Sequence, residues 1–188
     1  MRFLSMESGV NYQKQRSGSM TELELQKYLE AKNTFACNNY PLYLNDIPQI
    51  TPNKIRAELR RLGKVDLLVL DYLQLANSDD KKESRHLEVG AVSRGLKAIA
   101  KEFHIPVLVA AQLSRESAKR TGQTESRKPI LSDLAESGSI ERDADIVIFL
   151  DREDGASEAD VILAKQRNGE VGVFSCEYLG ERTMFRNR

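Results

Sequence analysis

The sequence predicts an α/β protein with a mostly parallel sheet, flanked by helices and ending in an antiparallel edge. Two apolar runs, Leu67–Leu70 and Pro106–Ala111, lie on either side of a long amphipathic segment at 84–103. This order predicts a strand–helix–strand crossover, which makes the two strands parallel. Unbroken apolar runs are typical of strands that are buried on both faces. Near the C-terminus, Asn168-Gly169 separates two shorter strand-like segments and favours a tight hairpin turn.

The helices are predicted from capping residues that precede apolar residues at helical spacing. Met1–Gly9 has the pattern of a helix end, with Gly9 as the stop signal. Ser19-Met-Thr-Glu22 has the S-x-x-E form of a capping box, and Thr51-Pro52 supplies an N-cap followed by a first-turn proline. The longest predicted helix covers about 84–103. Its apolar stripe consists of Val89, Val92, Leu96, Ile99 and Phe103.

The predicted strands follow one another from the first third of the chain to its end. A short strand is expected at Leu42–Asn45, and the two parallel strands end near Asp71 and Gln112. A third strand of the same buried type is expected at Asp145–Leu150. The hairpin and the last strand are expected at Val161–Lys165, Val171–Glu177 and 183–185.

Composition excludes several classes of protein. Lys plus Arg and Asp plus Glu both number 28, so any DNA-binding charge has to be local. Cys37 and Cys176 are far apart, which argues against a zinc site and against a disulfide framework. No signal peptide is evident, and the apolar runs are far shorter than the ~20 residues of a membrane span. We therefore expect a cytoplasmic protein without a membrane partner.

Two polar residues follow the predicted parallel strands. Ligands of open α/β sheets bind beyond the carboxyl ends of the strands, and Asp71 and Gln112 occupy such ends. An Asp after four apolar strand residues is the Walker B pattern, in which the carboxylate holds nucleotide-bound Mg²⁺. Gln112 could hydrogen-bond a γ-phosphate. From these residues alone, Asp71 fits a capping role equally well, and Gln112 fits a polar strand terminus better.

Basic residues mark two further segments. Lys165 and Arg167 are two positions apart, so they share one face of the hairpin and could reach a phosphate across a subunit boundary. The alternative is a solvated edge charge that discourages aggregation. Residues 114–128 contain five basic residues and two acidic ones, starting with Arg115, which suits phosphates or a solvated loop. Aromatic residues are absent from that segment, so base stacking is not indicated.

Five segments, taken together and in order, are similar to one known family. The segments are LVLDYLQL at 68–75, AQLSR at 111–115, LSDLAESGSIE at 131–141, DAD at 143–145 and AKQRNG at 164–169. By these segments, the chain resembles the C-terminal motor domain of DnaB-type replicative helicases, from residue 1 to about residue 186.

The resemblance implies a RecA-like fold, a homo-hexameric ring, and ATP- and Mg²⁺-dependent movement along single-stranded DNA to unwind the duplex during replication. Asp71 resembles the Walker B aspartate, the ligand of the nucleotide-bound Mg²⁺. Gln112 resembles the γ-phosphate sensor. Lys165 and Arg167 resemble the pair that reaches a neighbouring subunit's site, with Arg167 as the arginine finger, which neutralises charge in the transition state.

The resemblance also implies a DNA-facing loop region at 114–142. Glu136 and Gly138 match positions of the central-channel loop that touches the DNA backbone, and Arg115 belongs to the same basic region. A glycine there lets a backbone N–H approach a phosphate closely. Ala135 departs from the family, which commonly has arginine at this position. The resemblance also implies that the intact parent protein binds single-stranded DNA and a helicase loader or primase.

One departure concerns the phosphate loop. The family's GxxxxGK[ST] motif lies upstream of the segment that resembles Met1–Gly9, and the only Gly-Lys pair here, Gly63-Lys64, precedes a valine. We therefore expect 1–188 to be a single, N-terminally truncated RecA-like domain that is inactive alone. Two alternatives remain open: a non-catalytic subunit or regulator that joins a helicase ring, and a stand-alone single-stranded DNA-binding module.

Overall fold

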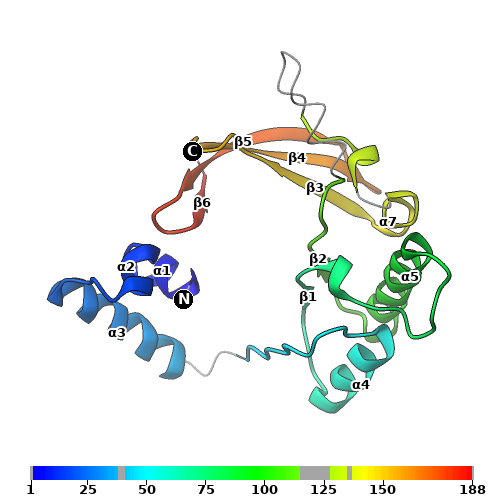
Figure 1. The fold of residues 1–188 in the computed structure, drawn as a ribbon, viewed down its shortest axis with the longest axis horizontal. Helices are drawn as coiled ribbons and strands as arrows, with labels where there is room; N and C mark the ends of the chain where they lie inside the picture. Colours follow the sequence, from blue (N-terminus) through cyan, green and yellow to red (C-terminus); the bar gives the residue numbers. More distant parts are fainter. Residues whose placement is uncertain (1, 38–40, 115–127, 135–136, 188) are drawn as a thin grey trace. The chain divides into compact units, whose positions relative to one another are not determined.

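The computed structural model describes residues 2–37, 41–114, 128–134 and 137–187 (Figure 1). These residues form two compact units. Unit 1 comprises Met1–Asn45, Leu150–Ile162 and Val173–Arg188, and unit 2 comprises Asp46–Phe149 and Leu163–Gly172. That the chain is a single domain therefore stays a prediction.

Three helices form the first part of unit 1: α1 (Arg2–Ser8), α2 (Tyr12–Ser17) and α3 (Glu22–Cys37). The helix end predicted near Gly9 is confirmed, because Gly9 has a φ of 68° and its N–H donates to the Ser5 carbonyl. The capping box of α3 was predicted wrongly at Ser19–Glu22. Thr21 and Glu24 form it, with 2.9 Å from the Thr21 nitrogen to Glu24 Oε2 and 3.3 Å from the Glu24 nitrogen to Thr21 Oγ1.

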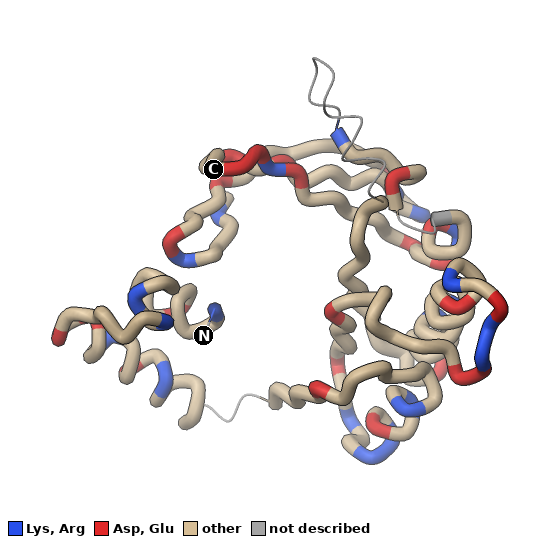
Figure 2. The backbone as a smooth tube through the Cα atoms, viewed as in Figure 1, with Lys and Arg blue, Asp and Glu red and all other residues tan. Residues whose placement is uncertain are grey.

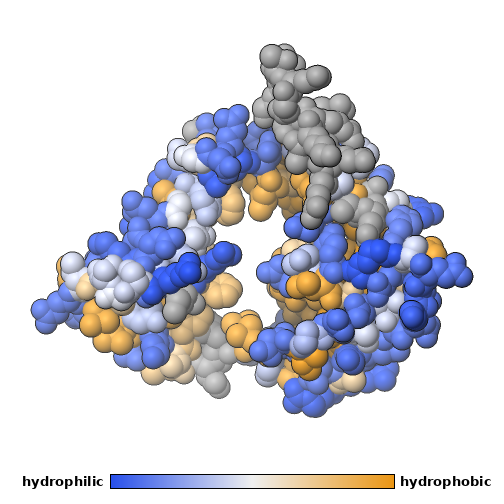
Figure 3. Space-filling view, viewed as in Figure 1, coloured by the Kyte–Doolittle hydropathy of each residue, from blue (hydrophilic) through white to orange (hydrophobic). Residues whose placement is uncertain are grey.

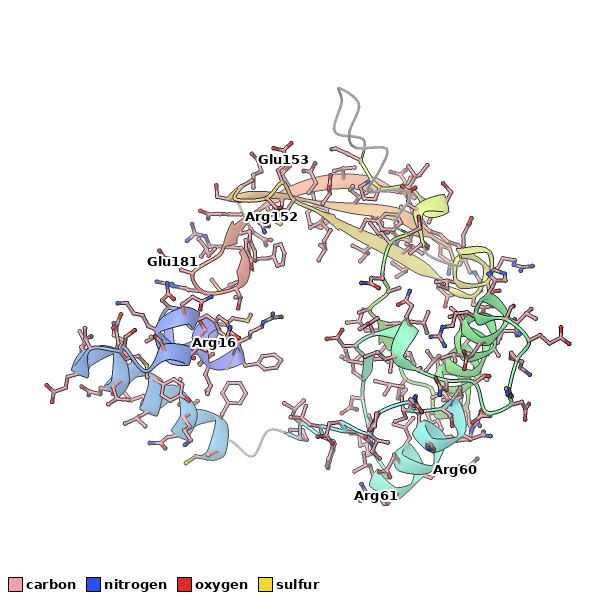
Figure 4. The ribbon with its side chains drawn as sticks, viewed as in Figure 1. Arg16, Arg60, Arg61, Arg152, Glu153 and Glu181 are labelled. Atoms are coloured by element: carbon pink, nitrogen blue, oxygen red, sulfur yellow. The ribbon has the colours of Figure 1, made fainter. Side chains whose placement is uncertain are left out.

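Contacts between distant segments hold unit 1 together. The rings of Phe3 in α1 and Phe35 in α3 are 6.5 Å apart. The Tyr12 N–H at the start of α2 donates to the Glu181 carbonyl at 2.8 Å, so α2 lies beside the turn that contains Glu181. Arg16 on α2 and Glu181 are labelled in Figure 4. Arg152 lies over the Tyr178 ring, 4.6 Å from its centroid.

The strand–helix–strand crossover is confirmed in unit 2. Strands β1 (Leu68–Leu70) and β2 (Val107–Val109) are parallel, with Val69 opposite Leu108. Helix α5 (Arg85–Phe103) connects them, and α4 (Pro52–Leu62) precedes β1. The predicted cap of α4 is confirmed, since Thr51 accepts from the Lys54 N–H. Ser84 likewise accepts from the Leu87 N–H at the start of α5.

The core of unit 2 lies between the helices and one face of β1 and β2. Its buried members come from α4, α5 and the segment after β1: Ile55, Leu59, Leu73, Ala76, Val89, Val92, Leu96 and Ile99. On the other face, Val69 is 55% exposed and Leu108 is 59% exposed. The expectation that these strands are buried on both faces was therefore wrong in this structure. Figure 3 shows apolar side chains at the surface around β1 and β2.

A second sheet has four strands in the order β3-β4-β5-β6 and is antiparallel. Its strands are β3 (Ile146–Asp151), β4 (Glu158–Gln166), β5 (Gly172–Leu179) and β6 (Met184–Arg186). The predicted antiparallel C-terminal edge, including the turn at 167–169, is confirmed. The predicted mostly parallel sheet needs a correction, because β3 pairs with β4 and the parallel sheet has two strands among the described residues. The short 152–157 connection suits a hairpin and is too short for a parallel crossover.

Two segments differ from the sequence prediction in detail. Residues 42–45 are not assigned to a strand. The predicted loop region at 114–142 contains a 3₁₀ turn, η2 (Leu131–Asp133), and a helix, α7 (Ser137–Asp143), while its residues 115–127 and 135–136 lie outside the described ones. Within the described part of the chain, no helix is long and apolar enough to cross a membrane.

Candidate functional site

Asp71 and Gln112 lie at the same edge of the parallel sheet. Leu70, the last residue of β1, is opposite Val109, the last residue of β2, so the two chains leave the sheet together. The pairing continues past the strands, because the Ala110 N–H donates to the Leu70 carbonyl and the Leu73 N–H donates to the Ala110 carbonyl, both at 2.9 Å. The predicted convergence of Asp71 and Gln112 at one end of the strands agrees with this register.

The side chain of Gln74 connects the two segments. Its Oε1 accepts from the Gln112 N–H at 3.2 Å, and its Nε2 donates to the Gln112 carbonyl at 3.5 Å. Arg85, in the first turn of α5, donates to the Gln74 carbonyl and pairs with Glu88. Sequence reasoning gave Gln74 no role, although it belongs to the LVLDYLQL segment. An amide can donate and accept at once, which is why glutamine suits this position.

The Asp71 carboxylate is exposed and makes no hydrogen bond or ion pair with the residues that the structure describes. Within those residues, no group of three or more His, Cys, Asp or Glu side chains could hold a metal ion. A single open carboxylate fits Mg²⁺ that takes its other ligands from phosphates and water, and it does not fit an all-protein metal cage.

Lys165 and Arg167 lie at the end of β4 and in the turn after it. The Arg167 N–H donates to the Asp145 carbonyl at 2.9 Å, and Arg167 Nη1 is 3.0 Å from Asp145 Oδ1. Lys165 Nζ donates to the Glu141 carbonyl in α7. Both cations lie near Asp145, and each has a partner within unit 2.

Lys97 of α5 is a third cation at this place. Its ammonium donates to Oδ2 of Asp145. That hydrogen bond lowers the pKa of Asp145, and the positive charges of Lys97, Arg167 and Lys165 act in the same direction. Sequence reasoning assigned no role to Lys97 or Asp145. Asp145 could have been noticed because it belongs to the quoted DAD segment, whereas nothing in the local pattern singled out Lys97.

Of the predicted DNA-contacting residues, Gly138 is described. It is exposed near the start of α7, a Cβ added there would meet nothing within 4 Å, and its carbonyl accepts from Arg142 Nε at 2.7 Å. Arg115 and Glu136, and with them Ala135, lie outside the described residues. Figure 2 shows both acidic and basic residues along α4 and α5.

These features agree with a comparison against known families. The sequence model of the "DnaB-like helicase C terminal domain" matches residues 1–187. The chain belongs to this family. DnaB-family relatives include the replicative DNA helicase DnaB of Mycobacterium intracellulare, 46% identical over 90% of this chain and 30% of the relative. The helicase DnaB of Geobacillus stearothermophilus is 39% identical over 100% of this chain and 42% of its own length.

Two solved structures agree with this assignment. A DnaB-like replicative helicase, described with its interactions with primase, matches with a TM-score of 0.88 and 30% identity, covering 100% of this chain and 46% of that one. A solved ATPase domain gives the same TM-score and identity over 69% of its chain. The RecA-like fold is therefore supported by both neighbours. The chain spans about a third to two-fifths of the length of the helicases from Mycobacterium and Geobacillus.

Proposed function

We propose that this chain is the metal-side and sensor part of a replicative DNA helicase, an ATP-hydrolysing ring that unwinds duplex DNA while moving on single-stranded DNA. The observation that carries the proposal is the common edge at which Asp71 and Gln112 follow two paired parallel strands. In this reading, Asp71 holds the Mg²⁺ of MgATP. Gln112 contacts the γ-phosphate and responds to its loss.

The hairpin residues would serve a neighbouring subunit of a homo-hexamer. Arg167 is 56% exposed, so its guanidinium can exchange the Asp145 contact for an outside anion. Lys165 lies half-buried beside α7 and would add positive charge close to the transferred phosphoryl group. Cations placed where negative charge develops in the transition state lower the barrier of phosphoryl transfer.

DNA contacts are proposed for Arg115, Glu136 and Gly138. The open space beside Gly138 supports an approach of its backbone to a phosphate. A primase is a proposed partner of the parent protein, supported by the structural relative described with its primase interactions. A helicase loader and a cytoplasmic location stay predictions.

Two measurements test the proposed function. The purified chain with MgATP should show no hydrolysis above background, because the sequence contains no GxxxxGK[ST] loop. The chain should then be mixed with full-length Geobacillus stearothermophilus DnaB whose own arginine finger is replaced by alanine. Wild-type chain should raise the ATPase rate of the mixed ring, and the Arg167→Ala chain should not.

The matched control is Arg61→Ala. Arg61 is also an exposed arginine with a carboxylate partner, Glu58, but it lies on α4. Figure 4 shows Arg61 and Arg60 on that helix. Arg61→Ala should restore hydrolysis as well as the wild-type chain does. Co-assembly shown by size-exclusion chromatography, together with no difference between wild type and Arg167→Ala, would contradict the role of Arg167.

A further inference from the structure

Two cations contact one carboxylate in unit 2, and a third lies close by. Lys97 comes from α5, Lys165 from the end of β4 and Arg167 from the turn after β4, while Asp145 directly precedes β3. We call the three basic residues the cation cluster. One carboxylate cannot balance three positive charges, so the cluster keeps positive charge that an anion could satisfy.

The contacts divide the carboxylate of Asp145 between two cations. Oδ2 accepts from Lys97, and Oδ1 lies 3.0 Å from Arg167 Nη1. The main chain adds a second restraint on Arg167, because its N–H donates to the Asp145 carbonyl at 2.9 Å. Arg167 is thus held by both the side chain and the backbone of Asp145.

We propose that Asp145 is a positioning residue, an internal counter-ion that holds the Arg167 guanidinium until a nucleotide phosphate takes its place. The proposal rests on the proposed function, because it assumes that Arg167 is a phosphate ligand. Beyond that function, a phosphate replaces the Asp145 carboxylate at the Arg167 guanidinium.

The exposure of the pair favours such an exchange. The side chains of Arg167 and Asp145 are 56% and 49% exposed, so water screens their attraction and an outside anion can reach the guanidinium. A triphosphate carries several negative charges against the single charge of Asp145, and phosphate oxygens suit the donors of an arginine well.

The contact with Lys97 allows Asp145 to lose its contact with Arg167. The contact with Lys97 uses the other carboxylate oxygen, so it can persist when Arg167 turns to a phosphate. The carboxylate then keeps a charged donor and is not left unpaired, which would otherwise oppose the exchange. The Arg167 N–H contact with the Asp145 carbonyl can also persist, since it involves no side-chain atom of Arg167.

The test measures binding of inorganic tripolyphosphate to the 188-residue chain by isothermal titration calorimetry at low salt. Asp145→Asn should bind about two- to fivefold more tightly than wild type, which matches the modest strength of an exposed ion pair. Asp145→Glu should return the affinity towards the wild-type value. Equal or weaker binding by a folded Asp145→Asn chain would overturn the inference.

Glu102→Gln is the matched control. Glu102 lies on α5, like Lys97, and pairs with two arginines, Arg56 and Arg60, at the surface. Like Asp145→Asn, this variant removes one negative charge, but at a position outside the cation cluster. It should leave tripolyphosphate binding within about a factor of two of wild type, because Glu102 pairs with Arg56 and Arg60, which lie outside the cation cluster. An increase equal to that of Asp145→Asn would overturn the inference by indicating a general charge effect.

Nuclear magnetic resonance on the wild-type chain gives a second test that needs no variant at Asp145. In a chain labelled with ¹⁵N-arginine and ¹³C-aspartate, the Arg167 Nε and Asp145 Cγ signals should shift with the same tripolyphosphate midpoint. A shift of Arg167 without Asp145 would overturn the exchange alone. Unchanged tripolyphosphate affinity in Arg167→Ala would instead overturn the phosphate role of Arg167, so the two failures are distinguishable.

Discussion

The side-chain amide of Gln74 binds both hydrogen-bonding groups of the Gln112 main chain, at 3.2 Å to the N–H and 3.5 Å to the carbonyl. Gln74 is three residues after Asp71, so this amide joins the segment of the proposed metal ligand to the segment of the proposed sensor. The contact lies just beyond the main-chain hydrogen bonds that join Leu70 and Leu73 to Ala110 after the ends of β1 and β2. A displacement of either segment therefore acts on the other through these two hydrogen bonds.

Replacing Gln74 should loosen the Gln112 segment. Gln74→Ala removes both hydrogen bonds, so we expect faster amide hydrogen exchange at Gln112 and a loss of about 0.5–1.5 kcal/mol in the free energy of unfolding. Gln74→Glu keeps an acceptor for the Gln112 N–H and should preserve more of the protection. Unchanged exchange at Gln112 in Gln74→Ala would show that the amide does not hold this segment.

The two faces of the parallel sheet should respond differently to truncation. Ile99 is fully buried beneath β1 and β2, whereas Leu108 of β2 is 59% exposed. Ile99→Ala should lower the free energy of unfolding by about 2–5 kcal/mol, because it leaves a cavity. Leu108→Ala removes a similar side chain from the open face and should cost less than about 1 kcal/mol. Urea denaturation of both variants measures the difference, and equal losses would contradict the one-sided core.

Two glycines of α5 and α7 should tolerate alanine unequally. A Cβ on Gly90 would lie 2.7 Å from Ser139 Oγ and 3.1 Å from Ser139 Cβ, so α5 and α7 approach closely there. Gly90→Ala should lower the free energy of unfolding by roughly 1–2 kcal/mol through overpacking. Gly138→Ala meets open space and should leave it unchanged or raise it by less than about 1 kcal/mol. Thermal or urea unfolding compares the two, and a stable Gly90→Ala would refute the close approach.

The Lys14–Glu24 contact in unit 1 predicts a specific dependence on pH. The hydrogen bond from Lys14, with help from the Thr21 backbone, lowers the pKa of Glu24 from 4.5 to about 2. A lowered carboxyl pKa adds stability above pH 4.5 that is lost as the pH falls from 4.5 to about 2. Carbon-13 NMR should find the Glu24 midpoint near pH 2 in wild type and closer to pH 4.5 in Lys14→Met.

The control for this titration is Lys27→Met, which removes a lysine from the same helix as Glu24. It should leave the Glu24 midpoint near its wild-type value, since Glu24 draws its hydrogen bonds from Lys14 and Thr21. A wild-type midpoint near pH 4.5 would mean that the 2.7 Å contact between Lys14 Nζ and Glu24 Oε1 is not maintained in solution.

The sequence by itself determined the elements whose signals are local. Thr51-Pro52 and the apolar stripe of 84–103 predicted α4 and α5, and Asn168-Gly169 predicted the turn after β4. The run of ordered motifs predicted the family, which the match over residues 1–187 confirms. Caps, helical periodicity and turn residues act within a few positions, so the amino-acid order contains them directly.

Only the tertiary structure decided which strand pairs with which and which side chains meet. The apolar run at 145–150 did not reveal that β3 pairs with β4, because an apolar run does not specify its neighbour. Lys97 and Arg167 are 70 positions apart, and their shared contact with Asp145 depends on how α5, β3 and β4 pack. Such contacts arise from chain topology and packing, which spacing along the sequence does not encode.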